Sequence, residues 1–392
     1  MSRALSVRRL TYALALVIAA PIGSIAAADT RVSLRDGEAP PRGEPLAITS
    51  HGVMFADPFI GGSTEGKLAP WHRIAMVEGD LAPKAAAYVE VARLAWRADA
   101  RLGRGDPSAA EPLFEELLQR YLNDAGPLRD LAAEGLTRCR IARGAHAAAV
   151  PSLILWLGGR DASSAPDDGL LDDASGLPRE LPPIFLPSSA ITAIPLPSVE
   201  LTDHASNALA WWYAEALRYE GGRPSQGDRP QLDERALGVS LVADIVLARV
   251  GDHSERSLAR TRLRDRLGRR GLAGLEMAWM RAWAITGIGR SLLLEDDPVL
   301  VREGVIDLLT VASTYEGETP RLASIALAEV AVAAHRLGLT REATDLRREL
   351  RGRYPGFPAL RWPELNSWPD HVTDLTARAA PNPSPLPETL QP

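Results

Sequence analysis

Apolar side chains recur at helical spacing on both sides of Gly105-Asp106. Intervals of three and four residues link Tyr88 to Leu102 before this break and Ala110 to Tyr121 after it, which places the apolar residues on one face of each helix. Asp106 can cap the second helix, and Pro107 fits its first position, where a missing N–H costs nothing. Because the break is so short, the pattern predicts a helical hairpin over residues 85–121.

Helical periodicity is lost in residues 159–203, which contain many prolines, and it resumes at about His204. Asp297-Pro298 and Thr319-Pro320 repeat the cap-and-proline start. The expected helices are Ala205–Tyr219, Leu232–Val250, Arg256–Leu267, Leu272–Gly289, Pro298–Tyr315, Pro320–Leu337 and Arg341–Arg353. The proline-rich segment is too apolar at 184–186 and 191–194 for a linker in solvent, and we expect it to lie along the helices and divide them into two sub-arrays.

Residues 29–80 show short β patterns instead of a helical period. A strand precedes the turn Asp36-Gly37, His51-Gly52 marks a hairpin tip, and the segment ends in Pro70-Trp71-His-Arg-Ile74-Ala-Met-Val77-Glu-Gly79. These features resemble the small Sm-like or SH3-like β-barrel that precedes helical repeats in some bacterial envelope proteins. The resemblance implies a barrel-like domain packed on the helices. Some such barrels bind RNA, but this one lacks a basic face, which favours a structural or protein-binding role.

The hairpin at Gly105 resembles a tetratricopeptide repeat. That repeat combines a small residue, a turn glycine, an alanine five positions later and a large residue four further on, which lets two helices approach closely. In this chain the matching residues are Ala98, Gly105, Ala110 and Phe114, then Gly144, Ala149 and Leu153, and finally Ala331, Gly338, Ala343 and Pro355. The second copy departs from the pattern at Pro151, and the third has Arg347 in the large-residue position, so that Leu346 and Leu350 must fill the groove. The first two copies lie 39 residues apart, whereas the typical period is about 34.

The first 28 residues have the layout of a secretory signal. Three arginines precede an apolar run from Tyr12 to Ala20, and Ala26-Ala27-Ala28 suits cleavage before Asp29. The alternative is a retained N-terminal anchor, but the run is much shorter than the roughly 20 residues that span a bilayer. We therefore expect a periplasmic or secreted protein without stable membrane insertion.

Charge and cysteine content narrow the range of partners. The formal net charge is −6, and it becomes more negative when the basic signal is removed, which argues against nucleic acid as a partner. The single cysteine, Cys139, cannot form an internal disulfide. Its place on an apolar helix face predicts burial.

No catalytic or cofactor signature is present. The seven histidines are scattered, and the chain contains no His-Glu-x-x-His, Gly-x-Ser-x-Gly or phosphate-binding glycine loop. Asp167-Asp168 and Asp172-Asp173 lack the ligand spacing of a calcium loop. We therefore expect no metal and no cofactor.

Two groups of residues are candidates for binding a partner. The first is the arginine run from Arg256 to Arg270, in which Arg256, Arg260 and Arg264 share a helix face; the alternative is a surface that pairs with the chain's own acids. The second is aromatic and centres on Trp212 in Trp211-Trp212-Tyr213, with Trp279 and Trp283 one turn apart. Exposed tryptophans can stack on sugars, but large aromatics in helices mostly fill hairpin interfaces.

These patterns predict a mainly α protein, a tetratricopeptide-like α-hairpin solenoid with a small N-terminal β-barrel-like domain. The expected divisions are a signal (1–28), a β domain (29–80), hairpins (81–158), a crossing segment (159–203), a second array (204–379) and a disordered proline-rich tail (380–392). The leading functional hypothesis is an exported, non-enzymatic scaffold that binds a protein or peptide in its helical groove. The alternative is a glycan-binding or glycan-cleaving helical toroid, which needs two converging carboxylates beside the tryptophans.

Overall fold

A computed structural model describes residues 30–35, 37–56, 66–159, 169–198, 205–231, 236–269 and 275–368. The chain is mainly helical, and it divides into two compact units, Met1–Ala92 and Arg93–Pro392. The predicted signal (1–28) and the predicted tail (380–392) lie outside the described residues. Each unit is described by itself below.

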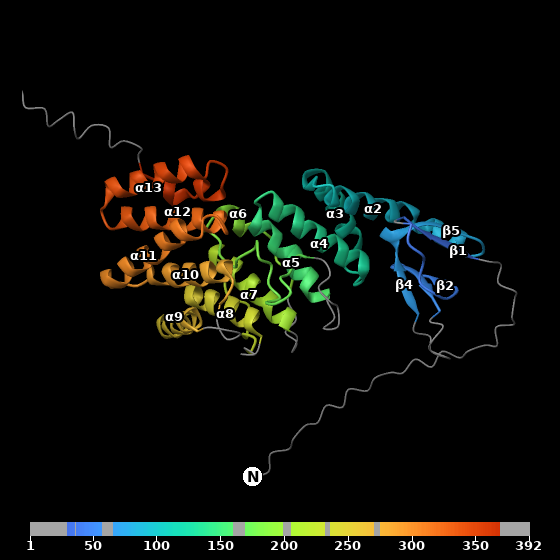
Figure 1. The fold of residues 1–392 in the computed structure, drawn as a ribbon, viewed down its shortest axis with the longest axis horizontal. Coiled ribbons are helices and arrows are strands. Elements are labelled where there is room, and N and C mark those ends of the chain that lie inside the picture. Colours follow the sequence, from blue (N-terminus) through green and yellow to red (C-terminus); the bar gives the residue numbers. More distant parts are fainter. Residues whose placement is uncertain are drawn as a thin grey trace, which may run out of the picture. The chain divides into compact units, whose positions relative to one another are not determined.

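The first unit contains two antiparallel sheets (Figure 1). One pairs β1 (Arg31–Leu34) with β5 (Ile74–Glu78), and the other has the order β2 (Pro45–Ile48), β3 (Gly52–Phe55), β4 (Lys67–Pro70). The predicted hairpin at His51-Gly52 is therefore present as β2–β3. The short helices η1 (Trp71–Arg73), α1 (Ala82–Ala85) and η2 (Ala86–Tyr88) complete the unit.

Trp71 is the centre of this small core. Its indole Nε1 donates to the Thr49 carbonyl at 3.1 Å, and its ring stacks on Tyr88 at 4.9 Å. Val53, Phe55 and Ile74 are buried around it.

The predicted closed barrel is wrong for the strands that the structure describes, because these strands form two separate sheets. The physical reason lies at Pro70-Trp71. Pro70 has no N–H to extend a ladder, and the 3-10 turn Trp71–Arg73 redirects the chain between β4 and β5. The two strands consequently join different sheets.

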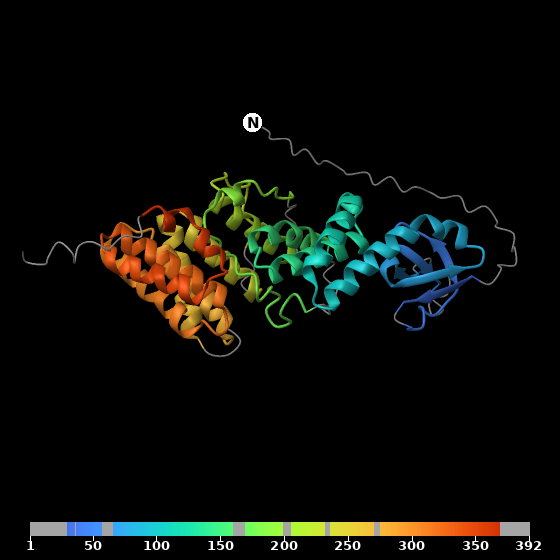
Figure 2. The same ribbon diagram turned by 90° about the horizontal axis from the view of Figure 1, so that it is seen from above.

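The helices of the second unit follow one another along the chain, and from α3 to α13 each long helix packs on the next (Figures 1 and 2). They are α2 (Val89–Gly103), which begins in the first unit, α3 (Pro107–Tyr121), α4 (Pro127–Ala142), α5 (His146–Gly159), α6 (Ser189–Thr192), α7 (Ala205–Glu220), α8 (Leu237–Val250), α9 (His253–Gly268), α10 (Ala278–Leu292), α11 (Pro298–Thr314), α12 (Pro320–Arg336), α13 (Thr340–Arg353), η3 (Pro358–Arg361) and α14 (Pro363–Asn366).

The three predicted hairpin glycines share one turn geometry. Gly105, Gly144 and Gly338 have φ of +77°, +74° and +77°, a conformation that favours glycine. At the first turn, Gly105 N donates to Leu102 O at 2.9 Å and Asp106 N donates to Arg101 O at 3.0 Å, and the other two turns repeat both bonds. The Asp106 side chain also caps Ala109 N at 3.1 Å. The three predicted glycine turns are thus confirmed, and the helices on either side of Gly144 and of Gly338 pack on each other.

Two prolines inside helices do not end them. Pro112 in α3 and Pro151 in α5 both stand at the sixth position of a helix, and both helices continue for at least two further turns. The departure that Pro151 makes from the repeat pattern therefore leaves the second hairpin intact.

Helices α8, α10 and α12 form an inner row. Each packs on the next, whereas α9, α11 and α13 pack between or beyond them. The three inner helices begin 41 and 42 residues apart. Every residue of α12 from Leu322 to Ala334 is buried, because the helix packs against α10, α11, α13, η3 and α14.

Candidate functional site

Residues 177–187 of the crossing segment pack on the helices and form neither helix nor strand. Leu177, Leu181, Ile184 and Phe185 are buried in the same core cluster as α7, α8 and α10. Leu181 N closes a turn by donating to Pro178 O at 2.8 Å. Side chains of the helices donate to the carbonyls of this segment: Tyr213 Oη to Leu181 O, Arg290 Nη2 to Phe185 O at 2.8 Å, and Arg321 Nη2 to Ile184 O at 3.3 Å. The helical array therefore holds an irregular segment through donors that bind its backbone.

A buried ionic cluster lies beside this segment. Arg290 of α10 donates from Nη2 to Glu220 Oε1 at 2.9 Å and from Nε to Glu329 Oε1 at 2.7 Å. Arg249 of α8 donates from Nε to Glu220 Oε1 at 3.0 Å. Burial alone would raise the pKa of Glu329, but Arg290 and Arg249 outweigh that effect and hold the pKa below its ordinary value. Glu329 is therefore ionised, and both carboxylates are paired with guanidinium groups.

This cluster forms the base of a pocket of about 530 Å³, which we call the C-terminal pocket. Apolar side chains of α10, α11 and α12 form its walls, and Pro187, the end of the irregular segment, lies at its edge. Tyr219 is 39% exposed and Leu337 is 44% exposed. The full lining is Pro187, Tyr219, Glu220, Gly222, Arg249, Leu293, Leu294, Val301, Glu329, Val332, Ala333, Arg336, Leu337, Trp362 and Glu364.

Trp362 contributes a hydrogen-bond donor that the described residues leave unused. The side chain is only 6% exposed, and its Nε1 has no partner among the described residues. A buried indole N–H normally finds an acceptor. This Nε1 atom is itself buried, so Trp362 lines the C-terminal pocket with other atoms of its ring.

The pocket lining carries three carboxylates, Glu220, Glu329 and Glu364, and two guanidinium groups, Arg249 and Arg336. Arg290 bonds Glu220 and Glu329 but is not part of the lining. A pocket with apolar walls that presents both hydrogen-bond donors and acceptors suits a ligand that carries both, as a peptide backbone does.

A second groove of about 620 Å³ lies between the end of α2, α4 and residues 169–180. Leu102, Phe114, Leu131 and Ile141 provide its apolar lining, and Glu134 and Arg138 form an ion pair at its wall.

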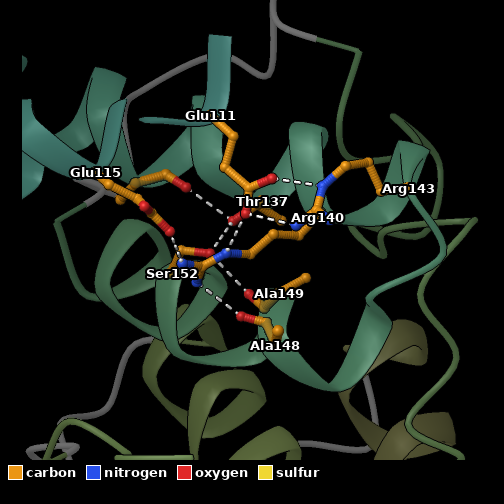
Figure 3. Close-up of polar contacts among 9 residues, drawn as sticks. Glu111, Glu115, Thr137, Arg140, Arg143, Ala148, Ala149 and Ser152 are labelled. Atoms are coloured by element: carbon orange, nitrogen blue, oxygen red, sulfur yellow. Dashed lines mark hydrogen bonds and ion pairs between the residues drawn. The ribbon is translucent and has the colours of Figure 1, made fainter. Parts of the chain in front are cut away.

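Polar contacts behind this groove hold α3, α4 and α5 together (Figure 3). Arg140 bonds to Glu111 Oε1 at 3.2 Å, Glu115 Oε1 at 2.9 Å and the Ala148 carbonyl at 2.8 Å. Thr137 Oγ1 donates to Ser152 Oγ at 3.0 Å. These groups are saturated by one another, so they fix the helices and leave no reactive group.

The predicted arginine face pairs with the chain's own acids. Arg260 bonds to Glu295 at 2.6 Å, Arg256 lies 3.5 Å from the same carboxylate, and Arg264 lies 3.5 Å from Glu303. Arg262 and Arg266 pair with buried Asp244. The interpretation as an ion-paired surface therefore accounts for the run from Arg256 to Arg266; Arg270 lies outside the described residues.

Trp212 lies in the core, 1% exposed, with its ring edge-on to Trp211 at 4.7 Å. Trp279 and Trp283 are also buried and in contact, at 4.9 Å. Trp212 therefore does not reach a partner in this fold, and the core interpretation holds for both aromatic groups.

The aromatic residues at the pocket are Tyr219 and Trp362, which sequence reasoning missed. One usable signal was the pair of Trp-Pro dipeptides, Trp362-Pro363 and Trp368-Pro369, after the last long helix.

Within the described residues, no group of three His, Cys, Asp or Glu side chains is placed to hold a metal ion. No helix in this part of the chain is long and apolar enough to cross a membrane.

No protein-family model matches the chain, and searches of curated proteins and of solved structures find no match either.

Proposed function

We propose that the chain is an exported, non-enzymatic scaffold that binds an extended peptide segment of a partner protein. One observation carries the proposal: α7, α10 and α12 already hold a segment that is neither helix nor strand, by donating from Tyr213, Arg290 and Arg321 to its carbonyls. The C-terminal pocket adjoins the end of that segment at Pro187 and is lined by both donors and acceptors. A partner peptide would continue along this surface.

A tetratricopeptide-like architecture is part of the proposal. The three glycine turns with equal φ and equal hydrogen bonds support it. The spacing of 41 and 42 residues between inner helices is longer than the typical repeat of about 34 residues. The array therefore resembles tetratricopeptide repeats in the geometry of its turns, but not in the length of its repeat. The N-terminal unit, with its Sm-like sequence features, acts in this proposal as a structural or protein-binding module.

Export rests on the signal-like pattern of residues 1–28. The periplasm, or the medium beyond it, is the proposed place of action. Neither nucleic acid nor a cofactor is a proposed partner, since the chain is acidic and carries no corresponding motif.

The glycan-active alternative has one feature in its favour, the two carboxylates Glu220 and Glu329 at a pocket that contains Trp362. Glycoside cleavage requires one carboxyl group that stays protonated through a raised pKa. Arg290 bonds both of these carboxylates, and the pKa of Glu329 is lowered. This arrangement favours a binding role.

The test is cross-linking in intact cells that produce the protein. A photo-reactive residue at Tyr219, on the pocket wall, should capture a protein adduct, whereas the same residue at Arg348, exposed on α13, should not. Adducts that form equally at both positions, or that contain only glycan, would contradict the proposal.

A further inference from the structure

The second groove, between the end of α2, α4 and residues 169–180, has no part in the proposed function, and we call it the α4 groove. Its volume of about 620 Å³ lies in the range of ligand-binding sites. Its position follows from the packing of the helices. α3 packs along α4 and α4 along α5, whereas α2 has no comparable packing against α3 or α4. The groove therefore lies where the first hairpin is open.

Apolar side chains form the lining between the charged groups of the α4 groove. Leu102 at the end of α2 and Leu131 on α4 are partly exposed, and Phe114, Ile141 and Leu170 are buried. A ligand in the groove would remove Leu102 and Leu131 from water, which favours binding.

The charges of the α4 groove are not balanced. Its ionisable lining residues are Asp99, Glu134, Arg138, Arg179 and Glu180. Both guanidinium groups have carboxylate partners: Arg138 bonds Glu134 at 2.7 Å, and Arg179 bonds Glu318 at 2.9 Å. Asp99 on α2 and Glu180 in residues 169–180 are exposed, and neither side chain makes a hydrogen bond or ion pair with another described residue. Two carboxylates from different walls of the groove are thus left without a cation.

An exposed aromatic residue extends the same surface along α2. Trp96 is 39% exposed and lies one helical turn before Asp99, and Gly103 of the groove lining follows one turn later. Residues at these intervals share a helix face. An indole ring attracts cations to its face, so a tryptophan beside a carboxylate suits a lysine or arginine side chain.

We propose that the α4 groove is a second docking site, which binds a basic amphipathic segment of a partner protein. Apolar side chains of that segment would cover Leu102 and Leu131, and its lysine or arginine side chains would pair with Asp99 and Glu180. The chain's net charge of −6 attracts a basic partner in the same way over a longer range. The groove shares no lining residue with the C-terminal pocket, and the proposal does not depend on the function proposed there.

The experiment measures the binding of three fluorescent peptides to the full chain by anisotropy, at a salt concentration of about 50 mM, where screening is weak. The lysine peptide is acetyl-Lys-Leu-Leu-Lys-Leu-Leu-Lys-amide. The glutamine peptide has Gln in place of each Lys, and the glycine peptide has Gly in place of each Leu. Because the groove offers both carboxylates and apolar surface, we expect the lysine peptide to bind about tenfold more tightly than either of the others.

Substitutions in the protein test whether the two carboxylates are the cause. Asp99→Asn and Glu180→Gln should each weaken binding of the lysine peptide about threefold, as expected for an exposed ion pair, and should leave binding of the glutamine peptide unchanged. The matched control is Asp173→Asn, which removes an exposed carboxylate of the same segment outside the groove lining and should have no effect.

A cross-link tests the position of the bound peptide. An added Cβ at Gly103 meets nothing within 4 Å, so a photo-reactive residue fits there. It should cross-link the lysine peptide, whereas the same residue at Asp173 should not.

The proposal is overturned if the lysine peptide does not bind, or if it binds no more tightly than the glutamine peptide. Equal losses in Asp99→Asn and Asp173→Asn would also overturn it, because they would show a general attraction to an acidic protein. Failure here is distinguishable from failure of the proposed function. Leu337→Glu, in the C-terminal pocket, should leave the affinity for the lysine peptide unchanged, and Asp99→Asn should leave the adduct at Tyr219 unchanged.

Discussion

The ring of Phe114 in α3 lies directly over Gly135 in α4: a Cβ atom at position 135 would stand 2.3 Å from it. Phe114 is fully buried, and so is the neighbouring Ala110. The large residue of the first hairpin is accommodated because the facing helix has no side chain there. This contact lies between α3 and α4 and involves a glycine outside the small-and-large pattern of the sequence.

Gly135→Ala should accordingly destabilise the protein, although alanine is the better helix former. Overpacking a filled core lowers the free energy of unfolding by about 1–3 kcal/mol. The midpoint of urea unfolding should therefore move to a lower urea concentration. The control is Gly352→Ala in α13, where an added Cβ meets nothing within 4 Å; it should be neutral or stabilise by about 0.4–1 kcal/mol. Equal effects of the two substitutions would contradict the packing account.

Arg290→Met should be among the most damaging single substitutions in the second unit. It leaves Glu329 buried without the guanidinium that bonds to it, and breaking a buried pair in this way costs about 3–5 kcal/mol. Arg348→Met, which removes an exposed pair with Asp345, should cost about 0–1 kcal/mol. Adding Glu329→Gln to Arg290→Met should recover part of the loss in denaturant melts, and no recovery would show that the charge is not the cause.

His146 predicts a specific acid sensitivity. Burial, with Arg321 nearby, lowers the pKa of His146 to about 3, against about 6.5 in the unfolded chain. The folded protein favours the neutral ring, so the contribution of His146 to the free energy of unfolding is fully present above pH 6.5 and is lost as the pH falls towards 3. Between these pH values the free energy of unfolding decreases by about 1.4 kcal/mol per pH unit. Unfolding free energies of His146→Gln measured from pH 7 to pH 4 should lack this slope, and an unchanged slope would contradict the assignment.

Cys139 should be unreactive in the folded protein. Its side chain is buried, and burial raises the pKa of the thiol to about 11, with Glu111 adding to the shift. Since the thiolate is the reactive form, a thiol-specific chromogenic reagent at pH 8 should label the native protein far more slowly than the protein in urea. Fast labelling of the native state would contradict the burial of this helix face.

The hairpins could be predicted from the sequence because their signals are local. Gly105, Gly144 and Gly338 each stand at a point where the helical pattern stops, and each adopts the left-handed conformation that glycine permits. Asp106 and Pro107 lie next to the turn that they define. A helix cap, a turn glycine and an apolar period can each be recognised from a few neighbouring residues, without information about the rest of the chain.

The sheet topology and the pocket could not be predicted in this way. Whether β4 and β5 join one sheet depends on the 3-10 turn at Trp71, which the alternating pattern around it does not reveal. The pocket brings together Glu220, Arg249, Glu329 and Trp362 from well-separated parts of the sequence, and only packing decides that they meet. For the same reason Trp212, one of many helix aromatics, could not be assigned to core or surface from its neighbours alone.

The central claim is that the C-terminal pocket binds an extended peptide of a partner. The most direct measurement is the yield of protein adduct from a photo-reactive residue at Tyr219 in intact cells, with and without Leu337→Glu in the lining of the same pocket. The account predicts a discrete protein adduct that Leu337→Glu removes, while Arg348→Glu on the outer face of α13 leaves it in place. An adduct that persists in Leu337→Glu at full yield, in a protein that melts normally, would contradict the account.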